Sequence, residues 1–113
     1  MNHVLIGSAV PFVVALVVFA LRGGRFGVPA LLVTPAAMLL GALWAVVPDI
    51  PRIAGMYDVY LDLMQSPRAD IFFWHHTLDR IESGSPWYAA GVAALYAALI
   101  LLAWNELRRR EAN

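Results

Sequence analysis

The sequence has no cysteine and no lysine, and few charged side chains of any kind. Without cysteine, the chain forms no disulfide and offers no thiolate to a metal ion. Charged residues make up 14% of its 113 residues, against roughly 25% in soluble domains. The formal net charge is zero, which argues against a nucleic-acid partner. These shortages favour a single membrane domain over residues 1–113.

Charge is absent from three long apolar runs, at residues 4–21, 26–47 and 83–105. A hydrocarbon core about 30 Å thick needs roughly 20 apolar residues in a helix. We therefore predict an all-α integral membrane fold with transmembrane helices at residues 4–21, 28–47 and 86–105. The first run lacks a preceding basic segment, so we expect a retained span and not a cleaved signal peptide.

A polar cap, residues 48–85, separates the second and third predicted spans. Apolar residues recur at helical spacing over residues 53–64 and again over residues 67–83, with charged residues on the other faces. This pattern is typical of helices that lie in the membrane surface. We predict two short interfacial amphipathic helices between the second and third spans.

The arginines predict how the chain crosses the bilayer. Arg22 and Arg25 lie in the short first connection, and three more arginines lie at 108–110. The cap has three arginines, but they are diluted by six acids. By the positive-inside rule, the N-terminus and the cap lie outside the cell membrane and the C-terminus lies in the cytoplasm.

Histidine and aspartate side chains are concentrated in the cap. His75 and His76 are adjacent, and Asp79 follows them by four and three residues, within side-chain reach of both on a helix. Asp49 lies where the second span leaves the membrane. Asp58 lies one helical turn before Asp62. Two like charges at this spacing destabilise a helix unless a cation compensates.

These side chains predict a metal site if the cap folds back over the end of the second span. Histidine and carboxylate groups bind Zn²⁺ and similar divalent ions. We expect the third span to return beside the second, which brings the cap over this end. The predicted ligands are Asp49, His75, His76, Asp79 and Asp58. In the alternative interpretation the histidines are polar interfacial side chains, Asp79 pairs with an arginine, and Asp49 caps a helix.

Residues 42–82 resemble the membrane-bound metal-dependent hydrolases, in which a Pro-Asp-(Ile/Leu)-Asp motif and a His-Arg-x-x-x-His-Ser motif hold the metal. Residues 48–50, Pro-Asp-Ile, match the first motif, and Pro51 stands where it has its second Asp. His75 or His76 matches one histidine of the second motif. The resemblance implies metal binding through Asp49 and one of these histidines, together with hydrolase activity. The whole sequence also resembles small three-pass membrane proteins of prokaryotes, which implies a fold but no reaction.

Two functions follow from these observations. The first is a metal site at the outer membrane surface that hydrolyses an ester or phosphoester. The second is a non-catalytic accessory or assembly subunit, which the small size of the cap favours because catalysis requires a positioned substrate. A transport role is disfavoured, since no ionisable residue lies inside a predicted span. The predicted partners are the lipid bilayer and either further copies of the chain or a larger membrane complex.

Overall fold

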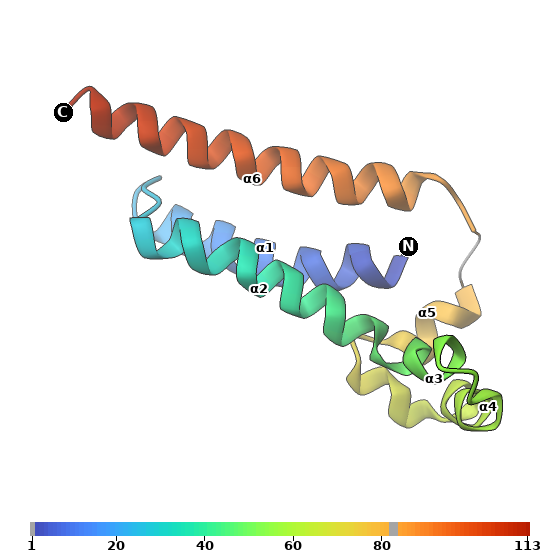
Figure 1. Ribbon diagram of the computed structural model, residues 1–113. Helices are drawn as coiled ribbons and strands as arrows, with labels where there is room; N and C mark the ends of the chain where they lie inside the picture. The colour runs from blue at the N-terminus through green and yellow to red at the C-terminus, as the bar shows by residue number, and fades with distance from the viewer. Residues whose placement is uncertain (1, 82–83) are drawn as a thin grey trace.

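Two long apolar helices form an antiparallel hairpin, and a third long helix runs along one side of it (Figure 1). This computed structural model describes residues 2–81 and 84–113. The hairpin consists of α1 (Asn2–Leu21) and α2 (Val28–Val46), and the third long helix is α6 (Trp87–Glu111). Throughout the described residues the chain is helical with turns and has no strand. The prediction of an all-α fold is confirmed.

The hairpin is held together by close backbone contact between two glycines. Gly7 of α1 and Gly41 of α2 face each other so closely that a Cβ atom on either one would overlap the backbone of the other helix. Small residues allow such an approach, and in lipid it brings van der Waals contact that larger side chains would prevent. The two glycines therefore set the spacing of α1 and α2.

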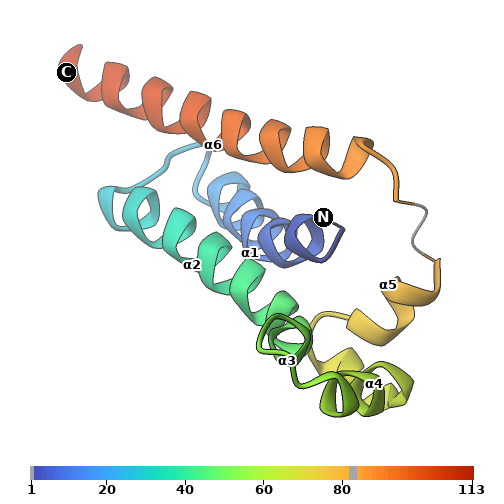
Figure 2. The same ribbon diagram turned by 45° about the vertical axis from the view of Figure 1, so that its right-hand side comes forward.

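The third long helix packs mainly along α1, which separates much of it from α2 in both ribbon views (Figures 1 and 2). Gly91 of α6 lies against the side chain of Leu5. Phe12, Met38 and Leu99, one from each long helix, form the buried apolar cluster. The sequence predicts that the third span returns beside the second, but its main neighbour in the structure is α1.

Two of the long helices extend beyond their predicted limits. α1 begins at Asn2, before the predicted start at residue 4, and α6 continues to Glu111, beyond residue 105. The predictions ended each span where the apolar residues ended, but backbone hydrogen bonding continues through polar residues. Arginines at 108–110 suit the last turn of α6, where the helix dipole is negative.

The cap consists of short helical segments. The chain continues from α2 through η1 (Val47–Asp49) and α3 (Ile50–Ile53), and it turns at Gly55, whose φ is +77°. It then forms α4 (Tyr57–Gln65), η2 (Pro67–Ile71) and α5 (His75–Ile81).

The two predicted cap helices differ from these segments in extent. The first, predicted over residues 53–64, begins at Tyr57, after the turn at Gly55. The second, predicted over residues 67–83, is divided into the 3-10 turn η2 and the helix α5. Its predicted last two residues, 82 and 83, lie outside the described residues.

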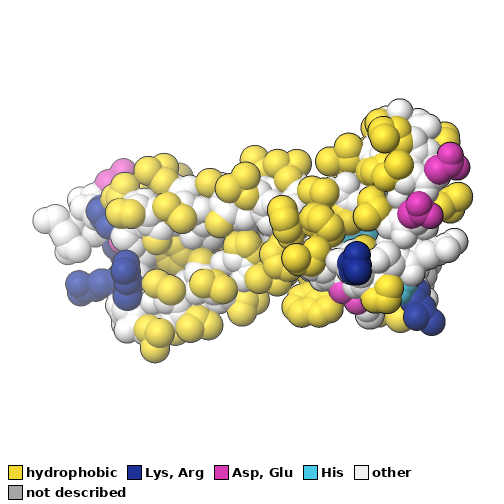
Figure 3. All heavy atoms as spheres, turned by 90° about the horizontal axis from the view of Figure 1, so that it is seen from below, with side chains coloured by type: hydrophobic (Ala, Val, Ile, Leu, Met, Phe, Trp, Pro, Cys, Tyr) yellow, Lys and Arg dark blue, Asp and Glu magenta, His cyan; other side chains and the backbone are white. Residues whose placement is uncertain are grey.

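The outer surface of the three long helices is apolar. Figure 3 shows hydrophobic side chains over the middle of the molecule and charged side chains gathered toward its two ends. Among the described residues, three helical stretches are long and apolar enough to cross a membrane, namely Asn2–Leu21, Val28–Ile53 and Trp87–Glu111. Side chains such as Leu32, Leu40 and Leu101 are about two-thirds exposed, as expected of surfaces that face lipid.

Candidate metal centre

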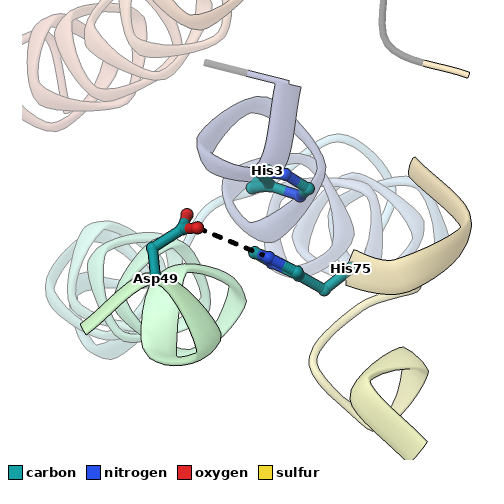
Figure 4. Close-up of side chains that lie close together, drawn as sticks. All are labelled: His3, Asp49 and His75. Carbon is teal, nitrogen blue, oxygen red and sulfur yellow. Dashed lines mark ion pairs between the residues drawn. The ribbon is translucent and has the colours of Figure 1, made fainter. Parts of the chain in front are cut away.

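Four ionisable side chains from three parts of the chain meet where the cap covers the hairpin. His3 comes from the first turn of α1, Asp49 from η1, and His75 and Asp79 from α5. Figure 4 shows three of them, His3, Asp49 and His75, directed toward one another. One potential ligand atom from each of these three lies within 4.8 Å of the others. The cluster thus joins residues that are up to 76 positions apart in sequence.

His75 is completely buried, and one hydrogen bond fixes the orientation of its ring. Its Nδ1 lies 2.8 Å from the backbone carbonyl of Ala45. Because a carbonyl only accepts hydrogen bonds, Nδ1 must be the donor, and in the neutral ring Nε2 carries the lone pair. That Nε2 lies 3.6 Å from Asp49 Oδ1 and 3.5 Å from Asp79 Oδ2, without a hydrogen-bond partner.

His3 completes the cluster from the opposite side. Its Nε2 donates to Asp79 Oδ1 over 2.6 Å, slightly shorter than the roughly 2.7–2.9 Å of charge-assisted N–H···O bonds. Its ring stacks on that of His75, with centroids 3.9 Å apart and planes inclined by 16°. His3 Nδ1 is buried and has no hydrogen-bond partner. The first turn of α1 is therefore tied directly to α5.

The turn before His75 has an unusual backbone. Phe73 and Trp74 both have positive φ angles, of 52° and 58°, which cost about 1–3 kcal/mol per residue without glycine. The end of α2 supports this turn, because Trp44 Nε1 donates to the carbonyl of Ile71 over 3.1 Å. The Trp44 ring also packs on Phe72, with centroids 4.8 Å apart. This packing helps direct His75 toward Asp49.

An aspartate side chain caps the start of α5. Asp70 Oδ1 accepts the Thr77 backbone N–H over 2.8 Å, and Asp70 Oδ2 accepts the Thr77 hydroxyl over 2.7 Å. Backbone N–H groups in the first turn of a helix otherwise lack a partner. The two Thr77 bonds, the backbone one first, hold the pKa of the Asp70 carboxyl below its usual value.

Opposing influences act on the pKa of His75. Burial alone disfavours the charged ring and lowers the pKa. The Asp49 carboxylate, the Ala45 carbonyl and the Asp79 carboxylate favour the charged ring, and together they raise the pKa above its ordinary value. The surroundings of His75 Nε2 therefore favour a cation at that atom.

The group suits a divalent transition metal ion. Zn²⁺ binds imidazole nitrogen and carboxylate oxygen at about 2.0–2.2 Å, so two ligand atoms of one ion are at most about 4.4 Å apart. The three groups lie near this spacing. The bond from His75 Nδ1 to the Ala45 carbonyl is of the kind that orients metal-bound histidines. Asp79, 15% exposed in its side chain, lies beside them.

Of the five predicted ligands, the structure brings Asp49, His75 and Asp79 together. The other two lie elsewhere: His76 Nδ1 contacts the backbone carbonyl of Met64 at 2.6 Å, and Asp58 is exposed in the first turn of α4. Adjacent residues on a helix point about 100° apart, so only one of the two histidines faces the cluster.

His3 was missed by sequence reasoning because the first span was predicted to begin after it. A signal was available, since the predicted topology already assigned the N-terminus and the cap to the same side of the membrane. A histidine at the start of the first span is then level with Asp49 at the end of the second. Including polar residues at span ends would have added His3 to the candidates.

A cavity of about 590 Å³ opens beside the cluster. Its volume falls within the range of about 300–1,000 Å³ that is common for small-molecule sites. One part of its wall is formed by His3, Asp49 and Asp79, and another by Arg52, Tyr57 and Tyr60. The cluster is therefore next to a space that a small molecule can enter.

No family model, curated protein or solved structure matches this chain. The resemblance to membrane-bound hydrolases accordingly stays a prediction from residues 42–82. The interpretation of the site depends on its own geometry, namely two stacked histidines and two carboxylates.

Proposed function

We propose that this chain is a three-span membrane protein that binds one divalent transition metal ion, Zn²⁺ or a similar ion, through His3, Asp49 and His75. The observation that carries the proposal is the direction of His75 Nε2. Nε2 faces the carboxylates of Asp49 and Asp79 at 3.6 and 3.5 Å, and in the neutral ring this atom has the lone pair that binds a metal ion. These groups repel one another unless a cation lies between them, and a buried position makes the repulsion stronger.

Hydrolysis of an ester or phosphoester is the reaction that we propose for this site. A bound divalent ion lowers the pKa of a water molecule and polarises the scissile bond. Asp79, which is outside the three-ligand group, is the candidate general base. Arg52 lines the adjacent cavity and supplies a positive charge for an anionic substrate group.

The arrangement of charges supports a definite topology. The α1–α2 connection and the C-terminal end of α6 lie at the end of the long helices remote from the cap (Figure 1), and these segments contain the arginines at 22, 25 and 108–110. We infer that this end faces the cytoplasm and that α4 and α5 lie at the outer surface of the cell membrane. The metal ion would then bind at the outer face.

A structural latch is the second candidate function, and the short hydrogen bond between His3 and Asp79 favours it. This bond joins α1 to α5 over 2.6 Å, and a proton at His75 Nε2 would serve in place of a metal ion. In that case the cluster holds the cap in one conformation, and the protein is an accessory or assembly subunit. The two candidates differ in their need for metal.

Metal titration of two histidine variants separates the candidates. Purified protein in detergent, stripped with a chelator, is titrated with Zn²⁺ by calorimetry. We expect one ion per chain, and His3→Gln should weaken binding at least tenfold because one of three ligands is lost. His76→Gln is the matched control, since His76 bonds to Met64 and not to the cluster.

Two results would decide against the metal site. One is wild-type protein that takes up no Zn²⁺, and the other is an equal loss of affinity in both variants. If His3→Gln then lowers the melting temperature without any effect of metal, the latch is the correct interpretation.

A further inference from the structure

A second cavity, of about 650 Å³, lies at the opposite end of the molecule from the His–Asp cluster. It is bordered by the connection between α1 and α2 and by the last turns of α6. Its charged lining residues are Arg22, Arg25, Glu106, Arg109 and Arg110. Four arginines therefore share one cavity with a single glutamate.

Glu106 is already engaged by the protein. It is 8% exposed, and its carboxylate accepts the backbone N–H of Phe26 over 3.3 Å and the Nε–H of Arg110 over 3.2 Å. The bond to Phe26 connects α6 to the hairpin, and the bond to Arg110 lies within α6. The carboxylate consequently has little remaining capacity to neutralise the other arginines.

The remaining arginines leave the cavity strongly positive. Arg109 donates through Nη1 to the Gly24 carbonyl over 3.2 Å, a bond that cancels no charge. Neither Arg22 nor Arg25 forms an ion pair with a residue that the structure describes. Arg108, in the same turn of α6, instead lies over the Trp104 ring at 5.1 Å and is not part of the cavity wall.

We propose that this cavity binds a phosphate group, carried either by the headgroup of an anionic lipid or by a free phosphate ion. Guanidinium groups recognise phosphate oxygens through paired hydrogen bonds. Basic pockets between transmembrane helices at the membrane surface are a usual location for anionic headgroups. The cavity lies at the ends of apolar helices, where a lipid phosphate would be level with it. The proposal does not depend on the metal centre.

Native mass spectrometry of the full-length protein in detergent tests this proposal. The probes are phosphatidylglycerol, phosphatidylcholine and inorganic phosphate, each titrated separately. We expect phosphatidylglycerol or inorganic phosphate to bind more tightly than phosphatidylcholine. A preference for phosphatidylglycerol identifies a lipid as the source of the phosphate, and tight binding of inorganic phosphate identifies the free ion.

Single arginine variants distinguish the cavity from the general positive charge of this end. Arg22→Gln and Arg25→Gln should each weaken binding of the preferred ligand about fivefold, which is the effect of one arginine on the affinity for an anionic headgroup. Arg108→Gln removes the same charge from the same end but outside the cavity, so it should leave binding unchanged. Circular dichroism melting checks that each variant is folded.

Two results would overturn the proposal. The first is binding of phosphatidylglycerol and phosphatidylcholine with equal affinity while inorganic phosphate does not bind. The second is an equal loss in Arg108→Gln and in the two cavity variants, which would mean that the arginines act only through the net charge of this end.

Discussion

At the scale of single residues, the position of one lone pair accounts for the candidate site. The Ala45 carbonyl fixes Nδ1 of His75 as a donor, which leaves Nε2 directed at two carboxylates. His3, in the first turn of α1, adds a second imidazole from a part of the chain that is distant in sequence. The chemistry of the site therefore depends on which nitrogen of a buried histidine carries the proton.

Asp79 should be needed for hydrolysis more than for metal binding. We expect Asp79→Asn to retain Zn²⁺ within a few-fold, because His3, Asp49 and His75 remain. Hydrolysis of chromogenic esters and phosphodiesters should fall at least a hundredfold, the usual contribution of a general base. Asp62→Asn, an exposed change on α4, is the control. Loss of the metal together with the activity would instead make Asp79 a ligand.

Asp70 should stabilise α5 in a pH-dependent way. Its pKa is lowered in the folded protein by its bonds to Thr77, so its stabilising effect is present above the unfolded pKa of about 3.8 and is lost as the pH falls through the folded value. We expect faster amide exchange in α5 of Asp70→Asn at neutral pH, and a smaller difference from wild type in acid. Asp58→Asn, in the first turn of α4, is the matched control. Equal amide exchange in α5 of the wild type and of Asp70→Asn would contradict the stabilisation of α5 by the Asp70 side chain.

At the scale of helices, close packing of α1 on α2 determines how near His3 and Asp49 come to each other. The contact at Gly7 and Gly41 allows the helix axes to approach, and the two residues of the candidate site lie beyond it at the same end of the hairpin. A bulkier pair here would separate the helices and, with them, the ligands.

A matched pair of glycine substitutions tests this contact. In Gly41→Ala the new Cβ meets the backbone of Gly7, which cannot move aside, so we expect a loss of about 1–3 kcal/mol. In Gly91→Ala the new Cβ meets only the end of the Leu5 side chain. The helix propensity of alanine favours that change by about 1 kcal/mol. Unfolding in mixed micelles measures both, and equal destabilisation would rule out the glycine contact.

The helices that could be predicted from sequence are those specified by local composition. The three spans follow from charge-free runs of sufficient length, and α4 follows from its spacing of apolar residues. The division of the second predicted cap helix could not be predicted, because Phe73 and Trp74 adopt positive φ without the glycine that usually marks such a turn. That turn is supported by Trp44, which is distant in sequence.

In the candidate site, too, local sequence predicted some contacts, and others depend on tertiary structure. Asp79 and His75 were predicted together because they are one helical turn apart. His3 was not, because the first span was predicted to begin after it and because its contribution depends on the packing of α1 against α5. The choice between His75 and His76 also depends on tertiary contacts, since only the fold decides which ring faces Asp49.

At the scale of the whole molecule, two polar ends flank an apolar middle. The cap end has the His–Asp cluster with its cavity, and the other end has the arginine cavity around Glu106. The long helices connect these ends, so a membrane would separate the two sites. The proposed metal chemistry and the proposed phosphate binding would then occur on different sides of the bilayer.

Single cysteines test this orientation, since the natural chain has none. We expect Asp62→Cys, in the exposed part of α4, to react with an impermeant maleimide added to intact cells. Asn113→Cys should react only after the cells are permeabilised. The reverse labelling pattern would show that the cap faces the cytoplasm.

X-ray absorption at the zinc edge tests the central claim most directly, because it reports the atoms bound to the ion. For the zinc-loaded wild-type protein, we predict a first shell of nitrogen and oxygen at about 2.0–2.2 Å, with the outer-shell scattering of two imidazole rings. His3→Gln should reduce this to one ring, and His76→Gln should leave two. A shell without imidazole, or a spectrum of His3→Gln identical to that of the wild type, would contradict a metal centre formed by His3, Asp49 and His75.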